Sequence, residues 1–405
     1  MSQVARATSP FAFFILVLPY GISGGFASIT LPFVLTQAGF PVALSASIVA
    51  IGISSNIWRF LWGPVADLTL TPRRWYLLGL AAGAVTLLVM SLMPLRQSAV
   101  AMLAAVVFLS QVAATLIVLP LGGLMAHTVA DAEKGRAAGW YQAGNLGGTG
   151  LGGGAGVWLA SHYSAALAGA VLAAAMLVCA LALLFVPSTP MSREGSLGRR
   201  FRDIGSDFRE LLRSPMAVLA MLLVCSPIGA GAASGVWAAV APDWRAGPDT
   251  VALVTGVLGG VASAIGCVIG GWVSDRHGRW WSYFGAGIFM AAIAIAMAAA
   301  ARTPAVYSAG VLFYAVSTGM AYAAFSALLL HVIGRGAAVT KYATLSSLGN
   351  LPTSYMTAFD GWVHDRAGSG GMLVAEAALG LVCTALFLLA LGRVRARAQT
   401  TADAR

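Results

Sequence analysis

Two acidic corners of the chain have the residue types of an electrostatic contact. Asp67 and Asp275 each stand four positions after a glycine, at the end of an apolar run, and basic residues follow both. A carboxylate in such a place can accept hydrogen bonds from a helix N-terminus and pair with arginine. The alternative is a solvated anion that only caps a turn. The residues of the two corners are Gly63, Asp67, Arg73, Arg74, Gly271, Asp275, Arg276, Gly278 and Arg279.

Arg59 is a cation inside an apolar run, eight positions before Asp67. On a helix it lies roughly 12 Å deeper than that aspartate. A charge in apolar surroundings is costly and needs a partner or water. The matching position of the second corner is Cys267, so the repeat itself does not need the charge. A guanidinium suits bidentate binding of carboxylate or phosphate, which predicts a site for an anionic group. Alternatively, the side chain reaches the membrane edge or pairs with a loop carboxylate.

Two further sets of polar residues lie inside the apolar runs. Asp360 and Glu376 are the carboxylates there, both near the predicted outer face. A buried carboxylic acid can carry a proton, although either residue could equally touch lipid headgroups. Amides and phenols within the runs could line a cavity or bond a neighbouring helix. The candidates for binding a solute beside Arg59 are Tyr20, Asn56, Gln111, Asn145, Tyr322 and Asn350.

The composition places the chain in lipid. Of its 405 residues, 59% are hydrophobic and 9% are charged, and the mean hydropathy is +0.83. Soluble domains carry about 25% charged residues, so this chain cannot cover a water-facing surface. The net charge of +10 does not indicate nucleic acid, because the basic residues stand in short loops between apolar runs.

Sequence motifs for catalysis, metals and nucleotides are absent. The four cysteines stand singly in apolar runs, with no Cys-x-x-Cys or Cys/His cluster for zinc. There is no Gly-x-x-x-x-Gly-Lys-Ser/Thr phosphate loop, no His-Glu-x-x-His and no Gly-x-Ser-x-Gly. The sequence therefore predicts a protein that is not an enzyme and needs no metal or cofactor.

Apolar runs long enough to cross a bilayer must position these residues. A spanning helix needs about 20 apolar residues, and on that template we count about twelve. The predicted spans are 10–36, 44–64, 75–95, 99–126, 139–160, 165–186, 215–241, 250–273, 281–301, 305–333, 342–363 and 372–392. The longest polar stretch, 187–214, divides them into two sets of six. Its apolar residues recur at helical spacing, which favours an amphipathic helix on the membrane surface over a flexible linker.

The two acidic corners are about half the chain apart, which indicates a duplication. We predict an all-α membrane protein with about twelve transmembrane helices in two pseudo-symmetric six-helix bundles. The bundles are 1–186 and 215–392, joined by the linker 187–214 and followed by a tail, 393–405. Most basic residues fall on one side of this topology, so we expect both termini to be cytoplasmic in a bacterial-type inner membrane.

The second corner resembles a known family signature. Gly271, Asp275, Arg276, Gly278 and Arg279 match the Gly-x-x-x-Asp-Arg-x-Gly-Arg loop of the major facilitator superfamily, and the first corner is a degenerate copy. The resemblance implies two bundles that rock about a central cavity, in a secondary transporter without enzymatic activity. A non-transporting sensor on the same scaffold is disfavoured because both corners keep their aspartates.

A longer phrase resembles one branch of that superfamily. The residues are Trp58-Arg59-Phe60-Leu61-Trp62-Gly63-Pro64-Val65-Ala66-Asp67. They are similar to the Trp-Lys/Arg-Phe/Leu-Leu-Trp-x-Pro-x-x-Asp phrase of AmpG-type muropeptide permeases and acetyl-CoA transporters. We therefore expect a monomeric, proton-coupled importer of an anionic, medium-sized solute. The alternatives are a proton-coupled exporter of small molecules and a siderophore permease; the Gly-rich fifth span lacks the proline of antiporters.

Overall fold

The computed structural model is helical throughout the residues that it describes, with no strand among them. These residues are 8–40, 42–187, 215–333 and 338–403, with the isolated positions Gly198, Arg202, Gly205, Ser206, Arg209 and Arg213. Most of the predicted amphipathic linker 187–214 lies outside the described residues, as do the last two residues of the predicted tail. The linker helix therefore stays a prediction.

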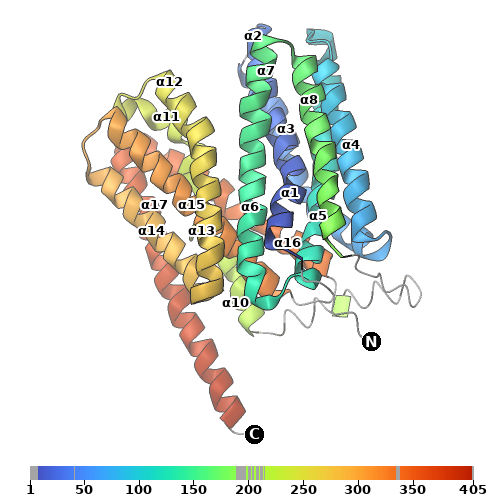
Figure 1. Cartoon of the computed structure of the whole chain (residues 1–405). Helices are drawn as coiled ribbons and strands as arrows, with labels where there is room; N and C mark the ends of the chain where they lie inside the picture. The colour runs from blue at the N-terminus through green and yellow to red at the C-terminus, as the bar shows by residue number, and fades with distance from the viewer. Residues whose placement is uncertain are drawn as a thin grey trace.

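The helices of the first half form one group in Figure 1. They are α1 (Pro10–Gly25), η1 (Phe26–Thr30), α2 (Leu31–Gln37), α3 (Val42–Leu68), α4 (Pro72–Leu92), η2 (Gln97–Ala99), α5 (Val100–Thr128), η3 (Asp131–Glu133), α6 (Lys134–Gly150), η4 (Leu151–Ala155), α7 (Gly156–His162), α8 (Ala165–Val178) and η5 (Cys179–Phe185).

Most helices of the second half form another group beside it (Figure 1). They are α10 (Pro215–Val224), η6 (Ala232–Gly235), α11 (Trp237–Val240), η7 (Ala241–Trp244), α12 (Pro248–Val251), η8 (Ala252–Leu258), α13 (Gly259–His277), α14 (Arg279–Ala299), α15 (Pro304–Val332), α16 (Ala338–Leu348) and α17 (Asn350–Asp403). The groups meet where α13 and α15 pack on α6, and where α16 packs on α3 and α5. The predicted all-α fold in two bundles is confirmed.

Most of the predicted spans each lie within a continuous helical segment. Eight helical segments of the described residues are long and apolar enough to cross a membrane, judged by length and composition. The segment 340–393 contains two predicted spans, which the non-helical residue Gly368 separates at φ 66°. The other three predicted spans correspond to α3, to the glycine-rich run from α6 to α7, and to 215–241.

The prediction of a single helix over 215–241 is wrong. The helix α10 ends at Val224, and only short helical pieces follow from Ala232 onward. Gly229 and Gly231 both have a φ of +65°, in the left-handed region that ends a right-handed helix. Pro227, which has no backbone N–H to donate, stands in the same stretch. We call residues 225–231 the helix break.

Close packing of α6 and η4 against α1 follows from glycines at four-residue spacing. A Cβ at Gly148 would lie 2.6 Å from the Leu18 carbonyl oxygen, and one at Gly152 would lie 2.1 Å from that of Ile22. Small residues allow such close approach of helix backbones in membranes. The glycines of this segment therefore serve helix packing.

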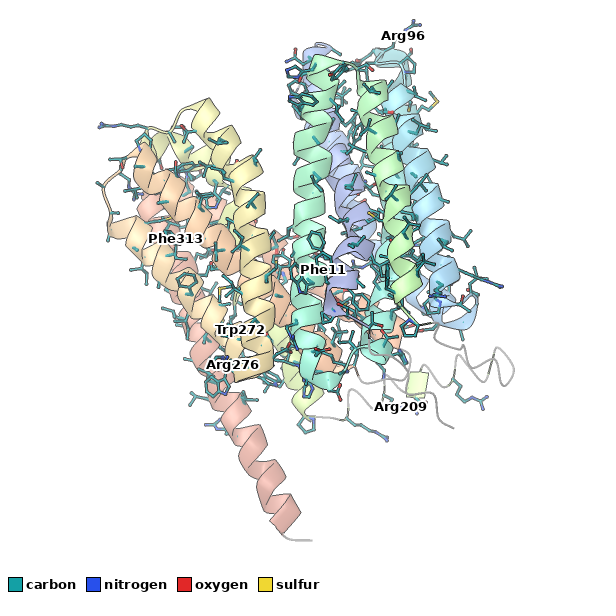
Figure 2. All side chains as sticks on the ribbon, viewed as in Figure 1. Phe11, Arg96, Arg209, Trp272, Arg276 and Phe313 are labelled. Atoms are coloured by element: carbon teal, nitrogen blue, oxygen red, sulfur yellow. The ribbon has the colours of Figure 1, made fainter. Side chains whose placement is uncertain are left out.

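Large apolar side chains cover the outer faces of both groups. Phe313 and Trp272 project outward in Figure 2, and 58% and 49% of their surfaces are exposed. Arg276 and Arg209 lie toward the end where α17 terminates, whereas Arg96 lies at the opposite end. An apolar belt between two charged ends is the surface expected of a protein embedded in a bilayer.

Candidate functional site

A cavity lies where the two halves meet, and both halves line it. The first half contributes residues of α1, α3 and α6; the second contributes the helix break and parts of α14, α15, α16 and α17. The cavity offers about 120 Å³ to the centres of water molecules. At roughly 10–15 Å³ per water, it holds on the order of ten waters or a small solute group.

Six of the seven predicted solute-binding residues line this cavity. They are Tyr20, Asn56, Arg59, Asn145, Tyr322 and Asn350. The seventh, Gln111, lines a neighbouring cavity that shares Tyr20, Asn56 and Asn145 with the first. Its amide donates to Ser23 of α1, at 3.2 Å from the hydroxyl oxygen. The sequence therefore predicted polar residues of five helices that line one space, although their solute-binding role stays a prediction.

Arg59 is the charged residue of the cavity wall among the described residues. It is 8% exposed, and its Nη2 donates to the Ser346 hydroxyl of the opposite half at 2.8 Å. Its Nε has no hydrogen-bond partner among the described residues. A guanidinium has five N–H donors in a planar fork, so much of its capacity is open to a ligand anion.

Hydrogen bonds hold the other polar side chains of the cavity in place. The Tyr20 hydroxyl donates to Asn56 at 2.9 Å, which joins α1 to α3. The Gln142 amide donates to the Ser326 hydroxyl at 2.7 Å, which joins α6 to α15 across the two halves. Asn145 donates to Gln142 at 3.1 Å. These amides are thereby oriented toward a shared polar space.

The sequence-based prediction missed several lining residues. Tyr141, Tyr342, Ser326 and Ser346 all line the cavity. The rings of Tyr141 and Tyr342 meet edge to face, with centroids 6.5 Å apart. Tyr342 and Ser346 are four positions apart on α16, so they share a helix face; that spacing was the one available signal.

Both acidic corners bind a helix N-terminus of the opposite half. Asp275 accepts from the backbone N–H groups of Gly135 (2.7 Å) and Arg136 (2.8 Å), which open α6. Asp67 accepts from the backbone N–H of Thr340 (2.9 Å) and its hydroxyl (2.6 Å), near the start of α16. N-terminal N–H groups have no intrahelical acceptor and carry partial positive charge, which favours a carboxylate. We call these the Asp275 contact and the Asp67 contact, and the end of the molecule where they lie the closed end.

The corner glycines allow these contacts to form. A Cβ at Gly271 would lie 2.6 Å from the Gly135 carbonyl oxygen, and one at Gly63 would lie 2.8 Å from the Thr340 Cα. Gly278 has a φ of +90°, which the turn between α13 and α14 requires. The two halves therefore touch backbone to backbone at both corners.

The corner arginines have separate partners. The Nε of Arg136, not one of the predicted corner residues, lies 3.4 Å from the Asp275 carboxylate. Arg276 stacks over the Trp272 ring, and Arg279 bonds His331 (2.8 Å) and the Asp131 carbonyl oxygen of the other half. Arg73 donates to the carbonyl oxygens of Leu183 and Val186, within the first half, and Arg74 is exposed.

The two predicted proton carriers lie together inside the second half. Asp360 is fully buried on α17, and Glu376, 8% exposed, lies on the same helix beyond the Gly368 interruption. Tyr314 of α15, which the sequence did not single out, donates its hydroxyl to Glu376. Neither residue belongs to the lining of the main cavity. Both are therefore core residues, and the alternative of contact with headgroups does not hold for Asp360.

The sequence matches a known protein family. A family profile described as Major Facilitator Superfamily matches residues 12–354. No curated protein matches the chain.

Three similar solved structures share the fold over 94% of this chain. The human organic anion transporter MFSD10 (TETRAN) is 17% identical with a TM-score of 0.71, and 100% of it is covered. The proton:xylose symporter XylE is 14% identical with a TM-score of 0.70, and 95% of it is covered. The E. coli fucose:proton symporter FucP is 13% identical with a TM-score of 0.72, and 98% of it is covered. At these identities the likeness shows the fold alone.

Proposed function

This chain belongs to the Major Facilitator Superfamily and is an integral membrane transporter, and on that premise we propose that it imports an anionic, medium-sized solute together with protons. Alternating access moves the solute: the two bundles rock so that the central cavity opens first to one aqueous phase and then to the other. The transporter works as a monomer in a bacterial-type inner membrane.

The inference that the solute is anionic rests on the burial of Arg59. A buried guanidinium with an unpartnered Nε faces a cavity whose other polar groups are neutral hydroxyls and amides. Among the described residues, no carboxylate forms an ion pair or hydrogen bond with it. The charge is costly without a counter-ion, and a solute carboxylate or phosphate would supply one.

The size of the cavity narrows the solute. Space for about ten waters accommodates an anionic group with a short body, while the rest of a larger solute must extend toward the open end. Tyrosines on three sides suit the apolar faces of sugar rings or acyl groups. A muropeptide or related acylated or sugar compound has this form, in agreement with the AmpG-type phrase around Arg59.

The conformation supports alternating access with the closed end toward the cytoplasm. The hydrogen bonds of Asp67 and Asp275 join the halves at the closed end, and those of Arg59 and Gln142 join them in the cavity wall. We propose that bundles 1–186 and 215–392 separate there to release the solute. Each contact then forms only in the outward-facing state and biases the transporter toward it.

Export is the second candidate function. The same cavity and corner contacts would serve a proton-coupled exporter or a siderophore permease. Import is preferred because the glycine-rich stretch from Gly144 to Gly156 packs against α1 without the proline that antiporters of this superfamily carry there.

Uptake by the purified protein in liposomes tests the proposal. We expect saturable uptake of radiolabelled muropeptides that bear a free carboxylate, increased by an acidic exterior, and little uptake of neutral sugars. Arg59→Lys keeps the charge and loses the fork, so uptake falls at least about tenfold, equivalent to roughly 1.4 kcal/mol of binding. The matched control is Arg96→Lys, an exposed arginine at the opposite end, which leaves uptake unchanged.

Equal uptake by the Arg59→Lys protein would contradict bidentate binding of a solute anion by Arg59. Efflux without uptake under either pH gradient would replace import by export.

A further inference from the structure

A buried acidic pair lies outside the main cavity, and no cation balances it. Neither carboxylate oxygen of Asp360 has a hydrogen-bond partner among the described residues, and neither does Oε2 of Glu376. Tyr314 donates to Oε1 of Glu376, and η6, which contains Ala232 and Ala233, packs against α17. Residues beside both acids, Phe359, Val363, Leu373 and Ala377, pack in one cluster with Tyr314, so the two carboxyl groups lie in the same part of the core. We call Asp360, Glu376 and Tyr314 the acidic pair with its tyrosine.

The surroundings of the pair are apolar on the remaining sides. The helix α14 presents Gly287, Met290, Ala291 and Ala294 toward Glu376. Among the described residues, no Lys, Arg or His makes a hydrogen bond or ion pair with either carboxyl group. Desolvation and mutual repulsion both oppose the doubly charged pair in such a site. One proton shared by the pair removes the repulsion.

A small void connects Glu376 to the helix break. It offers about 20 Å³ to water centres, which is room for about one water molecule. Pro227 and Gly229 of the break line this void together with Glu376. Gly229 also lines the main cavity, as do Ile228 and Ala230. One short stretch of left-handed backbone therefore separates the acidic pair from the solute space.

We propose that Asp360 and Glu376, with Tyr314, bind the coupling proton as a shared site, and that the helix break transmits its occupancy to the cavity. The proposal rests on the proposed transport function and supplies its proton site. When the pair is doubly ionised, Glu376 accepts strongly from Tyr314 and attracts the backbone N–H dipoles of η6, which follows the break. Uptake of one proton from water weakens these bonds, since a neutral carboxyl group is a poorer acceptor than a carboxylate. The wall formed by residues 228–230 then shifts, and by linkage a bound solute changes proton affinity to the same extent.

Carbodiimide labelling of the full-length protein tests the shared proton without any solute. N,N′-dicyclohexylcarbodiimide attacks protonated carboxyl groups in apolar surroundings. Trypsin cleaves after Lys341, Arg366 and Arg393, so the two acids fall in separate peptides, 342–366 and 367–393. Near neutral pH we expect one label per molecule, divided between these peptides. At alkaline pH the labelling falls by up to about tenfold per pH unit, as the protonated fraction of an acid does.

Conservative variants assign the label. Asp360→Asn confines it to 367–393, Glu376→Gln confines it to 342–366, and the double variant is unlabelled. The matched control is Asp365→Asn, because Asp365 is exposed on the same helix and its loss should change nothing. No labelling of the wild type near neutral pH, two labels per molecule, or protection by Na⁺ that K⁺ does not give would each overturn the proton site. Neutralising buried acids favours folding, so these variants remain testable.

Hydrogen exchange by mass spectrometry tests the link to the cavity. We expect the amides of residues 226–236 to exchange differently at acidic and alkaline pH, beyond the intrinsic chemical rate, in the wild type and in Asp365→Asn. The double variant Asp360→Asn/Glu376→Gln loses this difference. A difference that persists in the double variant would overturn the link. Both measurements are independent of Arg59 and of any solute, so the transport proposal and this proposal fail separately.

Discussion

Arg59 is buried although its charge is costly to bury, which supports the proposed role in binding a solute. Its guanidinium is almost fully buried and donates a hydrogen bond to a neutral hydroxyl, Ser346. A cation without a counter-ion weakens the folded state, so its presence needs a reason other than folding. The same logic applies to Asp360, whose carboxylate oxygens have no hydrogen-bond partner among the described residues.

The first prediction concerns Arg59→Met. Removing the uncompensated buried charge should raise the free energy of unfolding by about 1–4 kcal/mol while abolishing uptake. Thermal unfolding in detergent measures the first effect and liposome uptake the second. Arg302→Met is the matched control: its guanidinium stacks 4.3 Å above the Trp244 ring, so the same substitution there should lower stability. A lower unfolding temperature for Arg59→Met would show that Arg59 serves the fold.

The second prediction concerns pH and the loop that contains Asp243. Hydrogen bonding from Ser369, followed by His364, holds the pKa of Asp243 below its usual value. A carboxyl group with a lowered folded-state pKa stabilises the protein above its unfolded pKa of about 3.9, and this stabilisation is lost as pH falls through the folded value. Asp243→Asn should therefore lower thermal stability near neutral pH, and the deficit should shrink in acid. Asp365→Asn, exposed nearby, should show no deficit at either pH.

Residue types alone singled out Arg59, Asp67 and Asp275 as candidate site residues, because charges within or at the end of apolar runs are conspicuous. Tyr314 was not predictable in this way. A phenol in a long apolar helix is ordinary, and no local pattern shows that position 314 lies against position 376. Only the tertiary arrangement, in which α14 packs against both α15 and α17, brings the two together.

At the scale of elements, glycines decide how closely helices approach. The helices α13 and α6 meet backbone to backbone at Gly271 and Gly139. A Cβ at either glycine would lie 2.9 Å or less from the backbone of the other helix. The helix break is the opposite case: Pro227, Gly229 and Gly231 interrupt a run that hydropathy alone reads as one span. Hydropathy reports burial in lipid and not continuity, so the prediction over 215–241 failed although the proline and glycines were visible.

The third prediction concerns Gly271→Ala. The added methyl group would clash with the Gly135 carbonyl oxygen, so it should separate α13 from α6 and open the closed end. Cys267, fully buried at this junction, is a native reporter. Its alkylation rate, followed by peptide mass spectrometry, should rise about tenfold for a shift of roughly 1.4 kcal/mol. Gly285→Ala on α14, where a Cβ would meet nothing within 4 Å, is the control and should leave the rate unchanged.

At the scale of the whole molecule, two related contacts hold one end shut. The Asp67 contact joins α3 to α16, and the Asp275 contact joins α13 to α6. Each uses a carboxylate of one half and a helix N-terminus of the other. The duplication that the sequence indicated therefore reappears as a pair of reciprocal bonds. The sequence could not show which conformation is adopted, because the same residues serve every state of the cycle.

The fourth prediction concerns both contacts together. Asp67→Asn and Asp275→Asn each replace charge-assisted bonds, worth about 1.5–3 kcal/mol, by weaker neutral ones. Each should increase Cys267 alkylation, and the double variant should combine the two free energies, since the sites are separate. Cys267 lies near the Asp275 contact and not near the Asp67 contact. Asp67→Asn should therefore raise its alkylation rate only if both contacts open together. Asp365→Asn, which removes an exposed carboxylate outside both corners, should have no effect. A response to Asp275→Asn alone would mean that the corners open independently.

The long sequence separations of these contacts have a consequence for biogenesis. Asp67 and Thr340 are 273 positions apart, so the Thr340 donors reach Asp67 only after nearly the whole polypeptide has been inserted. Until then the first bundle exposes the glycine surface at Gly63 that α16 later covers. Quality-control proteases degrade chains that expose such incompletely packed surfaces. Truncation before α16 should therefore shorten the lifetime of an otherwise inserted first bundle.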